Sequence, residues 1–169
     1  MSTIMIAVVM VLVIAAISLI LVRISNHHRK IKTQKMMHHF SQLGTSNALA
    51  FTSQEILQDV VIGLDGINRK LLILHNQHES FEWKVVDLAQ VHNCSVKKVY
   101  LTSGPAHARE AHLDRLVLAI ELKQGGGIME VPFFTHSKNH IYQLAEMEQK
   151  AKYWVAVLSK LNTKDLNPV

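Results

Sequence analysis

The sequence contains a single cysteine, Cys94, among its 169 residues. One cysteine cannot form a disulfide within the chain, so the folded part does not require an oxidising compartment. Cys94 lies in the middle of a predicted strand, where a small buried thiol is the usual role of this residue type. No partner base that would make it a nucleophile can be placed beside it. We therefore expect Cys94 to pack in a core.

Signatures of catalysis and metal binding are also lacking. Gly125, Gly126 and Gly127 are not followed by the Lys-Ser/Thr of a phosphate-binding loop, and they lie between two predicted strands. His107 and His112 are five residues apart, whereas a metalloprotease helix needs two histidines four apart so that both rings reach one zinc ion. We therefore predict no enzymatic activity, no metal and no cofactor.

Charge is distributed unevenly along the chain. No Asp or Glu precedes Glu55, and no Lys or Arg precedes Arg23. Residues 23–39 carry five basic residues and no acid, whereas residues 40–169 carry thirteen basic and thirteen acidic residues, so the net charge of +5 is local. A nucleic-acid-binding domain would carry basic residues interleaved with aromatic ones on the folded part. We therefore predict no nucleic-acid partner.

The longest uncharged apolar run covers residues 4–22. As a helix it would reach roughly 28 Å at about 1.5 Å per residue, which approaches the thickness of a bilayer core. A cleaved signal peptide would need preceding basic residues and a shorter run, and a buried core helix is usually shorter. Because basic residues stay on the cytoplasmic side, we predict a single-pass helix in the inner (plasma) membrane. The N-terminus is expected outside and the rest of the chain in the cytoplasm.

The rest of the chain divides into three parts that differ in composition and in the pattern of apolar residues. Residues 23–47 predict a basic juxtamembrane helix and linker, residues 48–161 a folded domain, and residues 162–169 a polar tail. Within the domain, Asp65-Gly66 between two apolar runs predicts a β-hairpin. Pro132 in a later run indicates an edge strand or a bulge, because proline has no N–H for a strand ladder. The expected strands and helix are residues 60–64, 71–74, 81–86, 91–101, 116–122 and 128–134, followed by a helix over residues 138–161.

This order of strands and a closing helix resembles the pleckstrin-homology-like superfold over residues 55–161. The resemblance is carried by VVIGLDGINRKLLIL, VHNCSVKKVYL, DRLVLAIELKQGGGIMEVPFF and IYQLAEMEQKAKYWVAVLSKL. It implies an α+β domain with an antiparallel β-barrel or curved sheet closed by one C-terminal amphipathic helix, with Trp154 plugging the barrel. The chain also looks like bacterial single-pass membrane proteins that carry such a domain on the cytoplasmic side.

Domains of this superfold bind phosphoinositides, peptides or other proteins. Members that bind phosphoinositides carry a basic K-x(n)-R-x-R pattern near the first hairpin, where this chain has only Arg69 and Lys70. We therefore predict a membrane-anchored cytoplasmic scaffold or adaptor module that binds a protein or peptide through a strand edge or beside the last helix. The candidate partner surface comprises Arg109, Pro132 and Trp154.

An alternative function is binding of anionic lipid headgroups. Tethering to a membrane would hold basic side chains close to such headgroups, at about 1 kcal/mol per residue near the surface. An enzyme would instead need a pocket with converging polar groups. The candidate lipid-facing basic residues are Arg23, Arg29, Lys30, Lys32, Lys35, Arg69, Lys70, Lys97 and Lys98.

Overall fold

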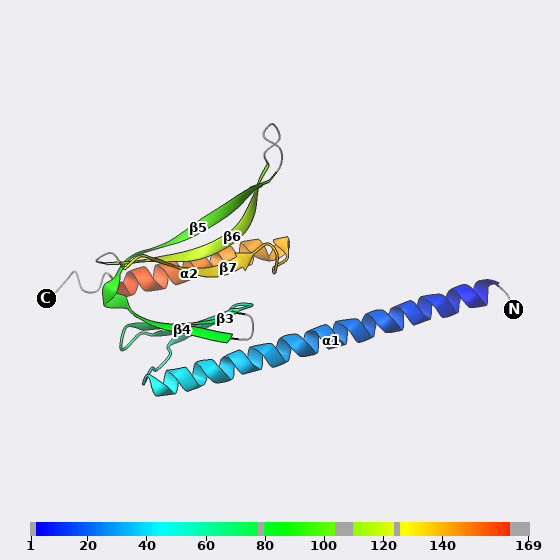
Figure 1. Cartoon of the computed structure of the whole chain (residues 1–169), viewed down its shortest axis with the longest axis horizontal. Coiled ribbons are helices and arrows are strands. Elements are labelled where there is room, and N and C mark those ends of the chain that lie inside the picture. Colours follow the sequence, from blue (N-terminus) through cyan, green and yellow to red (C-terminus); the bar gives the residue numbers. More distant parts are fainter. Residues whose placement is uncertain (1–2, 78–79, 104–109, 124–125, 163–169) are drawn as a thin grey trace. The chain divides into compact units, whose positions relative to one another are not determined.

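The computed structural model describes residues 3–77, 80–103, 110–123 and 126–162 (Figure 1). The chain forms two compact units, Met1–Ser41 and Gln42–Val169, of which the second contains the strands. The elements are α1 (Thr3–Ser46), β1 (Ser53–Ile56), β2 (Val60–Asp65), β3 (Lys70–Gln77), β4 (Ser80–Asp87), η1 (Leu88–Gln90), β5 (Val91–Ser103), β6 (Glu110–Leu122), β7 (Ile128–Thr135), η2 (Ile141–Gln143) and α2 (Leu144–Asn162).

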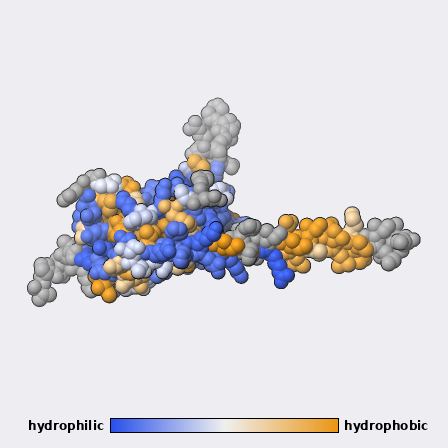
Figure 2. All heavy atoms as spheres, turned by 60° about the horizontal axis from the view of Figure 1, so that its bottom comes forward, coloured by the Kyte–Doolittle hydropathy of each residue, from blue (hydrophilic) through white to orange (hydrophobic). Residues whose placement is uncertain are grey.

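The first element, α1, is one continuous helix that includes the apolar run and the basic residues after it. Many of its exposed apolar side chains lie in residues 8–21 (Figure 2). A bilayer core is about 30 Å thick, and none of the helices in the described residues combines enough length and hydropathy to span it. This finding contradicts the predicted transmembrane helix at residues 4–22, the single-pass topology and the location in the inner membrane.

The strands form two antiparallel sheets rather than a barrel. The first has the order β1-β2-β3-β4 and the second the order β5-β6-β7. Consecutive strands pair because short turns join them, and the predicted hairpin at Asp65-Gly66 is confirmed as β2–β3. Among the described strands β4 pairs only with β3 and β5 only with β6, so the two sheets are not hydrogen-bonded to each other. The α+β class is therefore confirmed, whereas the prediction of one antiparallel β-barrel or curved sheet closed by a C-terminal helix is wrong, because the strands form two separate sheets.

The hydrophobic core contains residues from both sheets and one stripe of α2. Every second residue of a strand faces this core, and α2 contributes residues at spacings of three and four. Cys94 belongs to it, as the sequence predicted, and Trp154, which was named for the partner surface, belongs to it as well. The buried members are Leu57, Val60, Ile62, Leu64, Leu71, Ile73, Val86, Leu88, Val91, Cys94, Leu116, Leu118, Ile120, Val131, Phe133, Phe134, Ala151, Trp154 and Leu158.

A β-bulge at Pro132 confirms the prediction of an edge strand or a bulge. Leu116 pairs with Phe134 but the next residue, Val117, pairs with Pro132, so Phe133 is an extra residue in β7. In a regular strand two consecutive side chains point to opposite faces. The extra residue breaks this alternation, and both Phe133 and Phe134 are buried in the core. β7 also forms one edge of its sheet.

Candidate interaction surface

Strand β5 offers the longest unpaired strand edge in the described domain. It has thirteen residues without Gly or Pro, and its only partner is β6. Its last part, residues 99–103 (VYLTS), carries no charge, and we call it the β5 distal segment. Among the other edges, β1 has four residues, β7 contains Pro132 and a bulge, and β4 has eight residues with Glu82, Lys84 and Asp87 among them.

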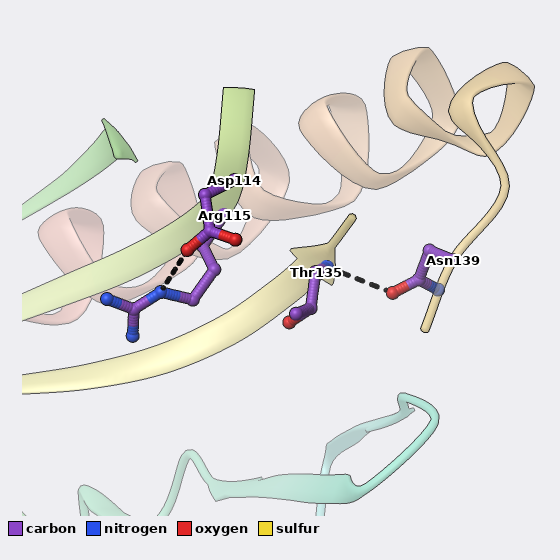
Figure 3. A network of polar contacts seen from close by, with 4 residues as sticks. All are labelled: Asp114, Arg115, Thr135 and Asn139. Atoms are coloured by element: carbon purple, nitrogen blue, oxygen red, sulfur yellow. Dashed lines mark hydrogen bonds and ion pairs between the residues drawn. The ribbon is translucent and has the colours of Figure 1, made fainter. Parts of the chain in front are cut away.

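The β5 distal segment extends past the third strand of its sheet. β7 pairs with β6 from Arg115 to Glu121 only, so residues 110–113 of β6 pair with β5 alone. β7 ends there because the chain turns away after Thr135, whose backbone N–H donates to Asn139 Oδ1 at 3.0 Å (Figure 3). Distal β5 and the start of β6 therefore form a two-stranded ribbon.

A second polar contact lies at the same end of the sheet. Asp114 is an extra residue in β6, because Val99 pairs with Arg115 while Tyr100 pairs with Leu113. Its backbone carbonyl accepts from the N–H of His136 at 2.7 Å, and its carboxylate pairs with Arg115 at 3.1 Å (Figure 3). The bulge and these contacts mark the point where the sheet narrows from three strands to two.

Helix α2 runs antiparallel to β5 and beside it (Figure 1). Asn162 Nδ2 donates to the backbone oxygen of His92 at 3.4 Å, and Glu148 pairs with Lys98 at 2.8 Å. The helical interval between these contacts is about 21 Å at about 1.5 Å per residue, and the strand interval is about 20 Å at about 3.3 Å per residue. Over this interval α2 and β5 therefore cover nearly the same distance, so that they lie side by side from one contact to the other.

Beyond Lys98, β5 enters the irregular part of its sheet. Two further residues of β5 advance about 7 Å, which corresponds to between four and five helical residues. Equal spacing would bring Tyr100 level with Leu144 at the start of α2, but the sheet has a register shift between Val99 and Tyr100, before that point. Tyr100 also lies on the same face of β5 as Lys98, because side chains alternate along a strand.

Large apolar side chains are exposed on distal β5 and on η2. The exposed fractions are 55% for Tyr100, 62% for Ile141 and 76% for Tyr142. The ring of Tyr142 stacks on that of His140, with 5.3 Å between the ring centroids.

The basic residues of β5 are paired with acids. Lys97 contacts Glu121 at 3.4 Å, and Glu148 binds both Lys98 and Lys152 at 2.8 Å. Hydrogen bonds from Lys152 and Lys98 lower the pKa of Glu148 to about 2, and the hydrogen bond to Glu148 raises the pKa of Lys98. Both lysines named as lipid-facing candidates are therefore ion-paired with acids of the domain.

Arg69, a third lipid-facing candidate, has a structural contact that the sequence did not predict. It lies in the β2–β3 turn with a left-handed backbone (φ 55°), and its guanidinium donates to the carbonyl oxygen of Leu161 at 2.5 Å. Its own carbonyl accepts from the N–H of Leu88 at 2.9 Å. A cation at the end of a helix satisfies carbonyls that have no partner within the helix. Arg69 therefore connects the first sheet to the C-terminal turn of α2.

Replacement of Arg69 by alanine is expected to lower the free energy of unfolding by about 1.5–3 kcal/mol, the range for hydrogen bonds to charged groups. Arg69→Lys keeps the charge but not the planar donor group, so we expect it to recover less than half of the loss. Urea unfolding followed by circular dichroism measures both values. Equal stability of the alanine variant and the unmodified chain would contradict the assigned contact.

Arg69 does not join Lys98 in one basic site. Their partners on α2, Leu161 and Glu148, are separated by about 20 Å along the helix axis. The fourth domain candidate, Lys70, lies half-buried at the start of β3 and pairs in register with Asp87. The structure thus places Lys97 and Lys98 on opposite faces of β5, and Arg69 at the other end of α2 from Glu148.

The other predicted site residues are placed as follows. Arg23, Lys30, Lys32 and Lys35 are exposed on α1, whereas the side chain of Arg29 and all of Arg109 and His107 lie outside the described residues. Pro132 is half-buried in β7. Trp154 is only 1% exposed, so it packs in the core and does not present a contact surface.

Cys94 has the environment expected of a packing residue. It is buried, and desolvation together with the charge of Glu121 raises the pKa of its thiol to about 11. A nucleophilic cysteine needs a lowered pKa, so this thiol is unreactive near neutral pH. No group of His, Cys, Asp and Glu side chains in the described residues could hold a metal ion.

Asp65 is the most strongly bound carboxylate that sequence reasoning missed. It is fully buried and accepts from the backbone N–H groups of Ala50, Ile67 and Asn68 and from the side-chain amide of Asn68, at 2.7–3.0 Å. These hydrogen bonds lower the pKa of Asp65 to about 2, and the bond from the backbone N–H of Asn68 has the largest effect. Ile67 and Asn68 lie in the β2–β3 turn and Ala50 lies before β1, so Asp65 connects this turn to the segment before β1.

No protein-family model, curated protein or solved structure matches the chain, so the resemblance to the pleckstrin-homology-like superfold stays a prediction.

Proposed function

We propose that this chain is a protein-interaction module that binds an extended segment of a partner protein by strand addition to the β5 distal segment. The observation that carries the proposal is an unpaired, uncharged strand edge of residues 99–103 in a two-stranded ribbon. Unpaired backbone N–H and C=O groups along such an edge are ready to bind another strand. The partner would add a strand on the β5 side of the ribbon, opposite the side of β6 on which β7 pairs.

The neighbouring charges support a peptide ligand rather than an anionic lipid headgroup. Recognition of a headgroup needs basic side chains that are available to its phosphates. Lys97 and Lys98 are bound to Glu121 and Glu148, and Arg69 is bound to the C-terminal turn of α2. The structure therefore favours the peptide-binding function over the lipid-binding alternative.

Proline substitution along β5 tests the proposal. Neighbouring residues of an antiparallel edge strand point their N–H groups in opposite directions, so one of Tyr100 and Leu101 directs its N–H away from β6. Peptides that bind the full-length chain would be selected from a random-peptide display library. One of the variants Tyr100→Pro and Leu101→Pro should remain folded and bind the selected peptides about tenfold more weakly, the loss expected for one net hydrogen bond.

Threonine variants at the same positions serve as matched controls, because they keep the N–H group and a side chain suited to a strand. The affinity of Leu101→Thr for the selected peptides should stay within about twofold of that of the unmodified chain, because only one exposed side chain, which faces away from α2, is changed. Folding of each variant is checked by circular dichroism. Selected peptides that bind both folded proline variants with unchanged affinity, or a library that yields no binder, would overturn the proposal.

A further inference from the structure

We infer that the outer edge of β4 binds the β4 edge of a second copy of this chain, in an antiparallel register centred on Trp83. The inference goes beyond the proposed function and does not depend on it, because β4 is an edge of the other sheet. Three properties of β4 identify the occupant: its regularity, the direction of its backbone groups and the order of its charges. The pairing would join two four-stranded sheets into one continuous sheet.

β4 is a regular edge strand with an exposed tryptophan at its centre. It pairs with β3 over eight residues without a register shift and contains neither Gly nor Pro. Among the described strands it has no partner on its other side. Trp83 is 51% exposed, although tryptophan is highly buried on average in folded proteins. Such an edge is suited to binding a further strand.

The hydrogen bonds between β3 and β4 show which backbone groups of β4 point outward. The N–H of Leu88 donates to the carbonyl oxygen of Arg69 at 2.9 Å, and this pair continues the β3–β4 register. Hydrogen-bonded and non-hydrogen-bonded pairs alternate in an antiparallel ladder, so the even-numbered residues of β4 bond to β3. The N–H and C=O groups of Trp83 and Val85 therefore point away from β3. Two such edges can exchange hydrogen bonds only where outward residues lie opposite each other.

The charges of β4 select one register among those that the backbone allows. With Trp83 opposite its own copy, Glu82 lies opposite Lys84 of the second copy, and Lys84 lies opposite Glu82. On the other face of the strand, Phe81 lies opposite Val85. Centring the pair on Glu82 or on Lys84 instead would place like charges opposite each other, which is destabilising. The complementary register is therefore the one with Trp83 on the two-fold axis.

The domain itself leaves these two charges without a counterion. Glu82 and Lys84 are exposed, and within the part of the chain that the structure describes neither forms an ion pair. Their ladder partners on β3 are His75 and Ile73. Burial lowers the pKa of His75 against the opposing effect of the Glu82 charge, so His75 is neutral near pH 7. Charges on an edge strand discourage pairing with unrelated strands, whereas a second copy supplies a partner for each of them.

Charge reversals on β4 test the register in the full-length chain. A strand pair of this length buries less than the roughly 800 Å² per partner of a standard interface, so self-association is measured by sedimentation velocity from about 1 µM to 1 mM. Lys84→Glu and Glu82→Lys each place like charges opposite each other in the symmetric pair. Each variant should therefore self-associate about tenfold more weakly than the unmodified chain.

Mixing the two variants separates the register from a loss of folding. In an equimolar mixture of Lys84→Glu and Glu82→Lys, every cross-strand pair again joins opposite charges, so the mixture should associate within about threefold of the unmodified chain. The double variant Glu82→Lys/Lys84→Glu is the matched control, because it keeps the net charge and the complementary order. It should also self-associate as the unmodified chain does. Circular dichroism checks the folding of each variant.

Tryptophan emission provides a second measurement. The chain has two tryptophans, and Trp154 is only 1% exposed, so a shift of the emission on dilution reports Trp83. An unmodified chain that stays monomeric over the whole concentration range would overturn the inference and leave the β4 charges as protection of the edge. Self-association that both reversals leave unchanged would place the contact on another surface, such as the exposed apolar residues of α1. Weakening without recovery in the mixture would contradict the register.

Discussion

Replacement of Trp154 by alanine is expected to lower the free energy of unfolding by about 3–5 kcal/mol, the usual cost of truncating a buried aromatic residue. Trp154 is 1% exposed and belongs to the hydrophobic core, which contains residues of both sheets. Domains of this size are stable by about 5–15 kcal/mol, so the variant should be partly unfolded at 37 °C. Urea unfolding of the full-length chain, followed by far-ultraviolet circular dichroism, measures the loss.

Phenylalanine at the same position is the informative control. The indole Nε1 of Trp154 is buried and has no hydrogen-bond partner among the described residues. A buried donor without a partner costs about 1–3 kcal/mol, and Trp154→Phe removes that cost while it leaves a smaller cavity than alanine does. We expect the phenylalanine variant to lie within about 1 kcal/mol of the unmodified chain. A loss as large as that of alanine would show that Nε1 is hydrogen-bonded in solution.

Replacement of Asp65 by asparagine is expected to lower the melting temperature by about 10 °C at pH 7. One oxygen of Asp65 accepts from Ile67 and Asn68 and the other from Ala50 and the Asn68 amide. Asparagine replaces one acceptor by an NH₂ donor, so two of the four bonds become contacts between donors. Asp87→Asn is the control, because Asp87 is exposed and accepts one hydrogen bond, from the N–H of Ala89. This substitution should lower the melting temperature much less than Asp65→Asn does.

The effect of Asp65 should depend on pH with a definite sign. Its pKa is lowered to about 2 in the folded state from an ordinary value of 3.8. Its contribution to stability is therefore complete above about pH 5 and is lost as the pH falls toward 2. Melting temperatures of the unmodified chain and Asp65→Asn should converge between pH 5 and pH 2. A constant difference over this range would contradict the assigned hydrogen bonds.

Local features of the fold could be predicted because they depend on neighbouring residues. Asp65-Gly66 predicts the β2–β3 turn, and Pro132 predicts the edge or bulge of β7. The helix predicted at residues 138–161 corresponds to η2 and α2. The strand expected at residues 116–122 begins six residues earlier in the structure, at Glu110, and this start was not predicted. Pairing with β5 makes it a strand, and pairing across a hairpin is not visible in local composition.

The candidate site was less predictable than the fold. A strand edge and the region beside the last helix were expected from the general way such domains bind. The choice of β5 over β7 depends on which strands end unpaired. The residues named in advance for the partner surface were not the exposed ones, since Trp154 is in the core and Pro132 blocks its own edge. Exposure depends on packing, which residue type predicts only on average.

By itself, the sequence determined the antiparallel α+β class, the order of the strands and the amphipathic character of the last helix, because these depend on periodicity and turn residues. Tertiary structure alone decided that the sheets remain separate and that the apolar run fails as a membrane-spanning helix. It also decided that Arg69 binds the carbonyl of Leu161, ninety-two residues away. Such contacts depend on how distant segments pack, and a basic residue has the same appearance in the sequence whether it is paired or available to a ligand.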